Sequence, residues 1–530
     1  MNKIAKYLNQ YTVGPVYSAP SILDAYSTDQ SILQVTPKVV AVPTSTEDIR
    51  KIINFSHQLA GKKIKMPISI RYSDRSKTGS SLGSGIVISM EKMDKVEEID
   101  PNQRLVRLQT GARLDTIQNT LALYGLYLPF EGDPNQSIGD LIAEHITLNR
   151  STKSGETILN YIPQAEVVLS NGEVIHAEPL NQRQYEKKKA ARNLEGKIYR
   201  NVAELIKVGQ EYLEKIPDYK HNRSGFPTIK NVVQKNKFNL LPLFFGAESS
   251  LGVVTEIILR CELLTDVPQY CVVVCPTLDS LQKSATALVG LSPNLLDFYD
   301  INILSNAEQT GKKLKLWRNI PESGYLLIAQ FQDLNIYRRT QKIKQIQKLF
   351  PPSAHLAISN KENYQDFVEL ESAISTFYNS FSASALPIVD SAHIPNANLN
   401  TFLIDLKKLE KNAKMSLPLS GSFLHQTYTV RPAIALNTKE NRHRALVIMQ
   451  QYAKIVHEHD GNLTGNASEG RLKAIFENTY TDKKVLKIYA KLREIFDPRG
   501  ILNPGTKQEA TPKSVVKELR TSYNTGILES

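Results

Sequence analysis

Hydrophobic and polar positions change their spacing several times along the chain, and each change indicates a new element. An apolar run begins at Val39 and stops at Pro43, which predicts a strand. The stretch after it has Ser and Thr before two acidic residues, which predicts a capped helix, and apolar residues up to position 70 predict a second strand. Residues 39–70 are therefore expected to form a β-α-β unit. Residues 1–35 show little periodicity and are expected to form an arm or a short helix.

The next part of the chain continues with strands and one clear helix. Residues 85–129 predict strand, turn and strand, and then a helix that starts near Leu114 and stops at Gly125. Residues 181–239 are polar and basic. Strong strand propensity returns in residues 240–264, which we interpret as the closing edge of a first domain.

A different pattern of apolar and polar residues begins at Tyr270. Residues 270–291 predict a strand followed by a helix, and residues 324–350 repeat that order. Two such units favour a ferredoxin-like antiparallel sheet with helices packed on it. Residues 438–510 are mostly helical around a glycine-rich interruption at 461–470, and they end in a turn sequence.

Length and composition describe a packed protein of several domains. The 530 residues are 41% hydrophobic and 22% charged, which excludes a disordered chain or a rod. The net charge of +12 comes without a block of cations interleaved with aromatic residues, so no nucleic-acid partner is expected. The start has no apolar signal core and no segment is apolar enough to span a bilayer, which predicts a cytoplasmic protein with at most peripheral contact with the inner face of the plasma membrane.

Five segments occur in the same order as the motifs of a known protein family. They are VPTSTEDI (42–49), IRYSDRSKTGSSLGSGIVISM (70–90), QSIGDLIAEH (136–145), FGAESSLGVVTEIILR (245–260) and FDPRGILNPG (496–505). Together they resemble the FAD-binding family that includes vanillyl-alcohol oxidase, D-lactate dehydrogenase and the glycolate oxidase subunit. The resemblance covers most of residues 36–510.

The resemblance implies an α+β fold, with a two-subdomain FAD-binding domain of the p-cresol methylhydroxylase (PCMH) type and a ferredoxin-like antiparallel-sheet substrate domain. The expected divisions are an N-terminal arm (1–35), the FAD-binding domain (36–265), the substrate domain (266–460), a C-terminal helical segment that returns to the flavin (461–510) and a tail (511–530).

The second segment corresponds to the loop with which the family holds the FAD diphosphate. Glycines suit such a loop because they let backbone N–H groups point at the ligand. Here Tyr72, Asp74 and Ser80 stand where the family has glycine, and nearby cations compensate for the added carboxylate. The loop residues expected to bind FAD are Arg71, Tyr72, Ser73, Asp74, Arg75, Ser76, Lys77, Thr78 and Gly79. The alternative is a basic surface loop that has lost the cofactor.

Further cofactor contacts are implied by the other segments. They are Pro43, Ser137, Ile138, Gly139, Asp140, Gly252, Val254 and Asn503. Asp140 replaces a family glycine. An ordinary buried strand is the alternative for Gly252, and a turn-forming Asn-Pro pair is the alternative for Asn503. His145 suggests a flavin attachment point or a base, against the alternative of a packed or capping histidine.

Oxidation of a hydroxy acid requires a cation that holds the carboxylate and a base that accepts the hydroxyl proton. The segment GSFLHQTYTVRP (421–432) falls on the stretch where the related dehydrogenases line the substrate pocket. The resemblance therefore implies Arg431 as the carboxylate clamp, His425 as the base and Tyr428 as a further catalytic candidate. On one strand Arg431 and His425 would share a face, while Tyr428 would point away. The alternative is a strand with polar residues on its wet face.

The segment 465–473 resembles a variant branch of the family, which makes Glu469 and Arg471 further catalytic candidates. The metal-binding sequence of the metal-dependent members is missing, so no metal is expected. The resemblance thus implies an FAD-dependent enzyme that oxidises a small D-2-hydroxy acid, such as D-lactate or glycolate, to the 2-oxo acid. A quinone, a cytochrome or another protein would accept the electrons. The alternatives are a non-catalytic member that has lost FAD, and a flavoenzyme of another reaction, such as an ether-lipid synthase or a reductase.

Overall fold

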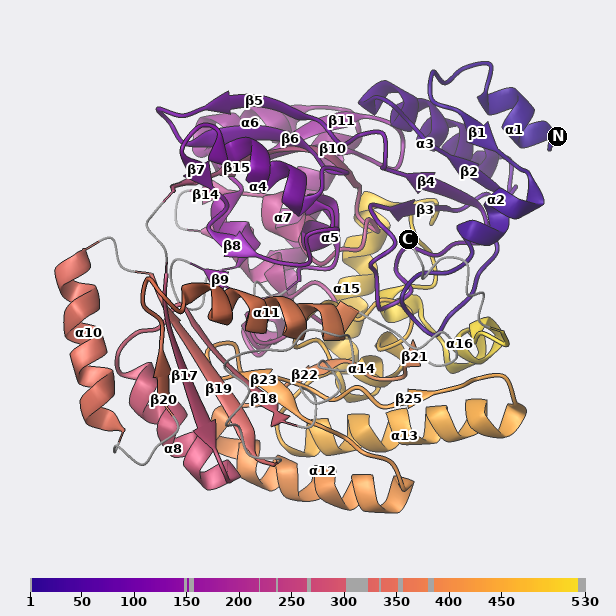
Figure 1. The fold of residues 1–530 in the computed structure, drawn as a ribbon. Coiled ribbons are helices and arrows are strands. Elements are labelled where there is room, and N and C mark those ends of the chain that lie inside the picture. Colours follow the sequence, from indigo (N-terminus) through magenta and orange to yellow (C-terminus); the bar gives the residue numbers. More distant parts are fainter. Residues whose placement is uncertain are drawn as a thin grey trace.

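A computed structural model describes residues 2–146, 150–151, 157–218, 220–234, 237–264, 268–301, 323–332, 335–350, 356–379 and 386–522. Figure 1 shows a first lobe formed by the N-terminal half of the chain, a second lobe built on a large sheet, and a C-terminal segment that reaches back to the first lobe. The α+β fold expected from the sequence is confirmed. The expected boundary at residues 265 and 266 lies outside the described residues.

The first sheet contains the expected β-α-β unit. Its strand order is β1-β2-β4-β3, with β1 Val16–Tyr17, β2 Val39–Ala41, β3 Ile68–Arg71 and β4 Ile86–Ser89, and its helices are α1 Lys3–Leu8, α2 Pro20–Ala25 and α3 Thr46–Gly61. The Ser45 side chain caps α3 by accepting a hydrogen bond from the Asp48 N–H. Strands β2 and β3 run parallel to β4. Because β1 pairs with β2, the N-terminal residues are part of this lobe.

A second sheet of five strands completes the first lobe. Its order is β11-β10-β15-β6-β5, with β5 Val96–Asp100, β6 Leu105–Gln109, β10 Gln164–Val168, β11 Val174–Ala177 and β15 Val253–Arg260. The helices of this part are α4 Leu114–Ala122, α5 Ile138–Ala143, α6 Gln182–Ala190 and α7 Leu194–Leu213. Helix α4 starts at the expected residue. The β15 strand is central, which confirms the strand expected in residues 240–264.

The second lobe is an antiparallel sheet with the order β20-β17-β19-β18-β23-β24-β22. The strands are β17 Gln269–Cys275, β18 Leu295–Asp300, β19 Tyr325–Phe331, β20 Leu356–Ile358, β22 Ser391–His393, β23 Ser420–Ser422 and β24 Thr427–Thr429. Its helices are α8 Leu278–Val289, α10 Ile336–Leu349, α11 Tyr364–Asn379, α12 Leu399–Ala413 and α13 Lys439–Glu458. The two expected strand-helix units are β17-α8 and β19-α10.

Helices cover both faces of this sheet. Along β17, Cys271 and Val273 pack into a core shared with α8, α12 and α13, whereas Tyr270 and Val272 pack on the opposite face against α11. Alternating side chains point to opposite faces of a strand, so an apolar run such as YCVVVC can fill two cores at once.

The C-terminal segment joins the two lobes. It contains α14 Ala474–Tyr480, α15 Lys483–Phe496 and α16 Pro512–Glu518. Helix α15 packs against α7, and Leu502 pairs with Ile68 at the edge of the first sheet. Residues 461–505 thereby return to the loop that follows β3. Among the described helices, none combines the length and the apolar character that crossing a bilayer requires.

The core of the second lobe gives a first prediction. Phe298 is fully buried and lies 5.2 Å from Phe423 and 6.1 Å from Tyr428, measured between ring centroids. Phe298→Ala should lower the free energy of unfolding by about 3–5 kcal/mol, because it leaves a cavity. Urea unfolding checks this, with Val208→Ala as the control, since Val208 is 76% exposed on α7. An equal effect of both substitutions would contradict it.

Candidate functional site

The loop between β3 and β4 forms a cradle of hydroxyl groups around one carboxylate. Three hydroxyls donate to the same oxygen, Oε1 of Glu144, from Ser76 at 2.5 Å, Ser80 at 2.6 Å and Thr78 at 3.2 Å. Glu144 ends helix α5 and is 4% exposed. Burial raises the pKa of Glu144 to about 7, against the effect of its hydrogen bonds to Ser76 and Ser80. The loop thus directs three donors at one carboxyl oxygen, which belongs to a side chain of the chain itself.

Tyr72 fills the space beside Gly139. Its ring is buried, and a Cβ at Gly139 would lie 2.1 Å from Cδ1 of Tyr72. The Tyr72 hydroxyl lies 3.2 Å from Oγ of Ser249 and donates to the Val254 carbonyl at 3.4 Å. One of the loop positions at which the resemblance implies glycine therefore carries a packed aromatic ring. Gly252 is also fixed by packing, because a Cβ there would lie 2.7 Å from Cγ1 of Val167.

The first turn of α5 uses its polar residues locally. Ser137 is the N-cap, and the Asp140 carboxylate accepts hydrogen bonds from the Ser137 N–H at 3.1 Å and from its hydroxyl at 2.8 Å. Burial raises the pKa of Asp140. Ile138 and Gly139 are buried, and the Gly139 N–H donates to the Thr110 carbonyl.

Two cations of the loop have partners within the first lobe. Arg71 donates to the Thr28 carbonyl at 2.8 Å and lies over the Tyr26 ring. Arg75 lies 3.4 Å from Asp74 and 3.8 Å from Asp133. Two further candidates belong to the first lobe. Pro43 is buried after β2, and the Ser73 hydroxyl accepts a hydrogen bond from the Arg75 N–H.

The C-terminal segment fixes the backbone of the loop. Arg471 donates to the carbonyls of Gly79 at 3.1 Å and Leu82 at 2.7 Å. Asn503 donates to the carbonyls of Ser80 at 2.7 Å and Glu248 at 2.8 Å. These two candidates therefore anchor the loop, because buried carbonyls need donors.

Glu469 belongs to a buried ion pair. Lys507 is fully buried, and its Nζ lies 3.2 Å from Oε2 of Glu469 and donates to the Gly225 carbonyl at 3.0 Å. The Gly225 N–H donates to the other oxygen of Glu469 at 2.7 Å. Burial raises the pKa of Glu469 to about 7, and Lys507 opposes this. Lys507 carries no motif signal, so sequence reasoning missed this pair.

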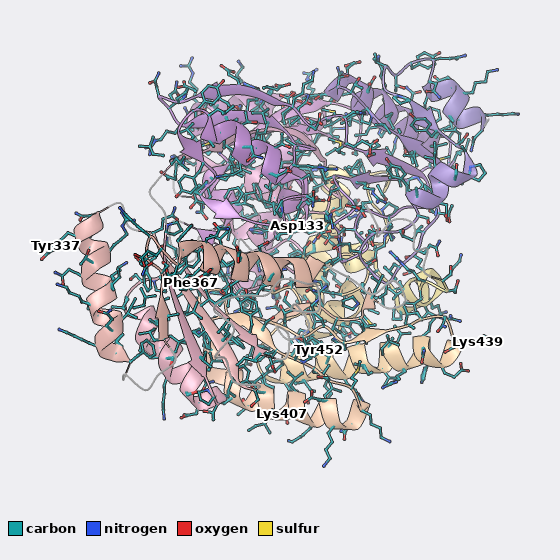
Figure 2. All side chains as sticks on the ribbon, in the orientation of Figure 1. Asp133, Tyr337, Phe367, Lys407, Lys439 and Tyr452 are labelled. Atoms are coloured by element: carbon teal, nitrogen blue, oxygen red, sulfur yellow. The ribbon has the colours of Figure 1, made fainter. Side chains whose placement is uncertain are left out.

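A pocket opens where the loop, the second lobe and the C-terminal segment meet. Four charged residues line it: Lys77, Asp390, Arg431 and Lys473. Tyr452 on α13, labelled in Figure 2, and apolar residues such as Ile388 and Phe476 form the rest of its wall. Burial would raise the pKa of Asp390, but the three cations outweigh it and hold the pKa below its ordinary value. The pocket thus has three cations around one carboxylate, which suits an anionic ligand.

Three histidines and an arginine form a cluster next to this pocket. The rings of His221 and His393 lie 4.8 Å apart. Burial, together with the smaller effects of His221 and Arg223, lowers the pKa of His393 to about 3 and that of His425 to about 4. His393 lies two residues from the pocket residue Ser391 on β22, on the same face and about 7 Å away along the strand. The imidazoles are therefore neutral at pH 7, and β22 connects the cluster to the pocket through His393 and Ser391.

The three candidates in residues 421–432 have different surroundings. Arg431 lines the pocket, and His425 belongs to the histidine cluster. Tyr428 is buried in the core of the second lobe and donates to the Asn396 side chain. The expectation that 425 and 431 share one strand face is wrong, because β23 ends at Ser422 and β24 covers only 427–429.

Sequence reasoning missed Asp390, Lys473, Arg223 and His393 as site residues. Lys473 ends the segment 465–473 but carries no assigned role, and the other three belong to no family segment. They meet only where the first lobe, the second lobe and the C-terminal segment come together. In the described part of the chain, no group of three His, Cys, Asp or Glu side chains is arranged to hold a metal ion.

The donor set of the loop fits part of a diphosphate-bearing cofactor. Its three hydroxyls already donate to one oxygen of the Glu144 carboxyl group, and Lys77 adds a cation whose charge acts on the same group. Tyr72 and Glu144 take space that smaller residues would leave open. Residues 76–80 are thus chemically suited to phosphate oxygens once the Glu144 side chain is displaced.

Comparison with known proteins is consistent with this arrangement. Residues 37–178 match the FAD binding domain, and residues 266–506 match the C-terminal domain of FAD linked oxidases. D-2-hydroxyglutarate dehydrogenase of Pseudomonas putida is 23% identical over 90% of this chain and 49% of its own length. D-lactate dehydrogenase of Archaeoglobus fulgidus is 22% identical over 91% of this chain and 95% of its own. The chain thus spans about half the length of the D-2-hydroxyglutarate dehydrogenases that it matches.

Among solved structures, 4-ethylphenol oxidase from Gulosibacter chungangensis shares the fold, with a TM-score of 0.65 and 12% identity over 94% of this chain and 95% of that one. Both lobes and the C-terminal segment are included in these matches. The chain belongs to the FAD-linked oxidoreductases that join a PCMH-type FAD-binding domain to an FAD-linked oxidase C-terminal domain, and FAD is the cofactor of this family.

Proposed function

We propose that the protein oxidises a small D-2-hydroxy acid to the corresponding 2-oxo acid, as the names of its D-2-hydroxyglutarate and D-lactate dehydrogenase relatives suggest. FAD supplies the acceptor for the hydride that leaves the substrate carbon. A quinone, a cytochrome or another protein then takes the electrons. The observation that carries this proposal is the pocket with three cations around one carboxylate.

The pocket explains how the substrate carboxylate would be held. Arg431 offers a planar fork that can bind both carboxylate oxygens, and Lys77 and Lys473 add positive charge at the same wall. Asp390 balances one of these charges, so the pocket keeps an excess of positive charge for an incoming acid.

The histidine cluster explains where the hydroxyl proton would go. A 2-hydroxy acid loses one proton from its hydroxyl and one hydride from its carbon when it becomes a 2-oxo acid. A neutral imidazole can accept that proton, and burial keeps His393 and His425 neutral at pH 7. We assign the base to His425 or its neighbour His393, because the cluster borders the pocket through β22.

A second candidate is a member of the fold that works without FAD, as a partner or scaffold subunit. Two observations favour it: Tyr72 packs against Gly139, and Glu144 occupies the hydroxyl cradle. Absorbance of the purified protein separates the two candidates. A colourless protein that takes up no added FAD would leave only the second one.

The proposed oxidation has a direct spectroscopic test. The purified protein with FAD should show the flavin bands, and anaerobic addition of D-lactate, glycolate or D-2-hydroxyglutarate should bleach them. The L-isomers of lactate and 2-hydroxyglutarate are the control and should leave the bands unchanged. Flavin bands that persist with every hydroxy acid would contradict the proposed reaction.

The carboxylate clamp gives a further prediction. Arg431→Met should raise KM about 10- to 100-fold, because it removes charge-assisted hydrogen bonds worth about 1.5–3 kcal/mol. Arg431→Lys should recover part of this loss, since it keeps the charge but not the fork. The matched control is Lys454→Met, a cation on α13 whose side chain is 67% exposed. Steady-state kinetics that show the same KM for Arg431→Met and the control would remove Arg431 from this role.

A further inference from the structure

Glu144 differs from other buried carboxylates of the first lobe in the number of hydroxyl groups on a single oxygen. Asp140 caps its own helix and also has a hydrogen bond with Ser73, Glu248 accepts from the Ser468 hydroxyl and the Gly470 N–H, and the two oxygens of Asp29 accept from the Ser31 and Ser81 hydroxyls, respectively. Glu144 instead directs one oxygen at three hydroxyls of a loop that lies 64 to 68 residues earlier in the sequence. The three donors come from alternate positions, 76, 78 and 80. A row of donors on one anion is how proteins hold phosphate or carboxylate oxygens.

We propose that the Glu144 carboxylate is an internal ligand of the diphosphate loop and that FAD binds only when its own diphosphate displaces this carboxylate from the Ser76, Thr78 and Ser80 hydroxyls. The loop then has two occupants that exclude one another. This inference concerns cofactor uptake and is independent of the substrate proposed above.

Charge repulsion prevents an ionised Glu144 and a diphosphate from occupying the cradle together. Four charged groups interact electrostatically with Glu144. They are Asp140 on α5, Glu248 in the turn before β15, Lys77 in the loop and Lys473 in the C-terminal segment. An ionised Glu144 and a diphosphate in one buried cradle repel each other, because little water lies between them. A protonated Glu144 carries no such charge, so displacing its oxygen from the three loop hydroxyls costs less free energy.

The pH dependence follows from the raised pKa. Glu144 titrates near pH 7 in the folded chain, so it is mainly neutral at pH 6 and mainly ionised at pH 8. FAD affinity should therefore fall by about tenfold in total as the pH rises from 6 to 8, because one competing group with a pKa of about 7 goes from mainly neutral to mainly ionised. Substrate and turnover are not needed to observe this.

The test is FAD binding by the full chain after removal of any co-purified flavin, followed by quenching of flavin fluorescence. Glu144→Gln keeps the size of the side chain and the hydroxyl contacts but removes the charge. It should bind FAD at least tenfold more tightly than the unmodified chain at pH 8, and its affinity should be nearly constant from pH 6 to 8. The control is Glu477→Gln, another buried carboxylate, which accepts from the Leu463 N–H and lies outside the cradle. It should leave the pH profile of FAD binding unchanged.

Melting temperature without FAD provides a second readout. A carboxyl group whose pKa is raised by folding stabilises the folded state below its unfolded pKa, near 4.5, and this contribution is lost as the pH rises through about 7. The unmodified chain should therefore lose more thermal stability between pH 5 and pH 8 than Glu144→Gln does. This comparison also shows whether the variant is folded.

Equal FAD affinities of the unmodified chain and Glu144→Gln, or no FAD binding by either one at any pH, would overturn the proposal. If Glu144→Gln does not fold, an FAD affinity of the unmodified chain that is constant from pH 6 to 8 overturns it as well. A Glu144→Gln protein that binds FAD tightly but is not reduced by any hydroxy acid would support this inference and contradict the proposed oxidation.

Discussion

The return of the C-terminal segment to the first lobe is the constraint on which the site depends. Arg471 and Asn503 provide the donors for three carbonyls of the loop after β3, and the buried Lys507–Glu469 pair ties the same segment to Gly225. A buried pair of this kind contributes little net stability, but removal of one partner leaves an uncompensated charge and is strongly destabilising. The segment is therefore held in one place, and it is this placement that turns residues 76–80 toward α5.

Much of the architecture could be predicted from the sequence because local signals and the family segments agree. Strand propensity and a capped helix determine β2, α3 and β3, and alternation along residues 270–275 gives a strand with two buried faces. The family segment at 70–90 placed Lys77 in the loop, and the resemblance of residues 421–432 to a substrate-pocket stretch placed Arg431 in the second lobe. Their meeting in one pocket required the fold, because they are 354 positions apart in the sequence and no local pattern relates them.

The contacts that could not be predicted are those between side chains from distant parts of the sequence. Three departures from glycine identified an altered loop, yet they did not show that the Tyr72 ring would use the room that Gly139 leaves. Glu144 was visible only as a departure from the family pattern in QSIGDLIAEH, and its role depends on hydroxyls from residues 76–80. The separation of His425 from Arg431 arose from a turn, in which Gln426 has a positive φ of 55° and ends any continuous strand.

The loop itself links the two halves of the site. Ser76, Thr78 and Ser80 direct their hydroxyls to Glu144, while Lys77, between the first two of them, lines the pocket. Lys77 and Lys473 both experience the charge of Glu144, and both also face Asp390. A change of charge in the cradle is therefore felt by the cations of the pocket, which lie in a poorly screened interior. Replacement of the Glu144 carboxylate by a diphosphate would increase the negative charge beside Lys77. The cofactor and an anionic substrate would then both interact with Lys77 and Lys473. Arg431, the third cation of the pocket, would therefore make most of the contact with the substrate.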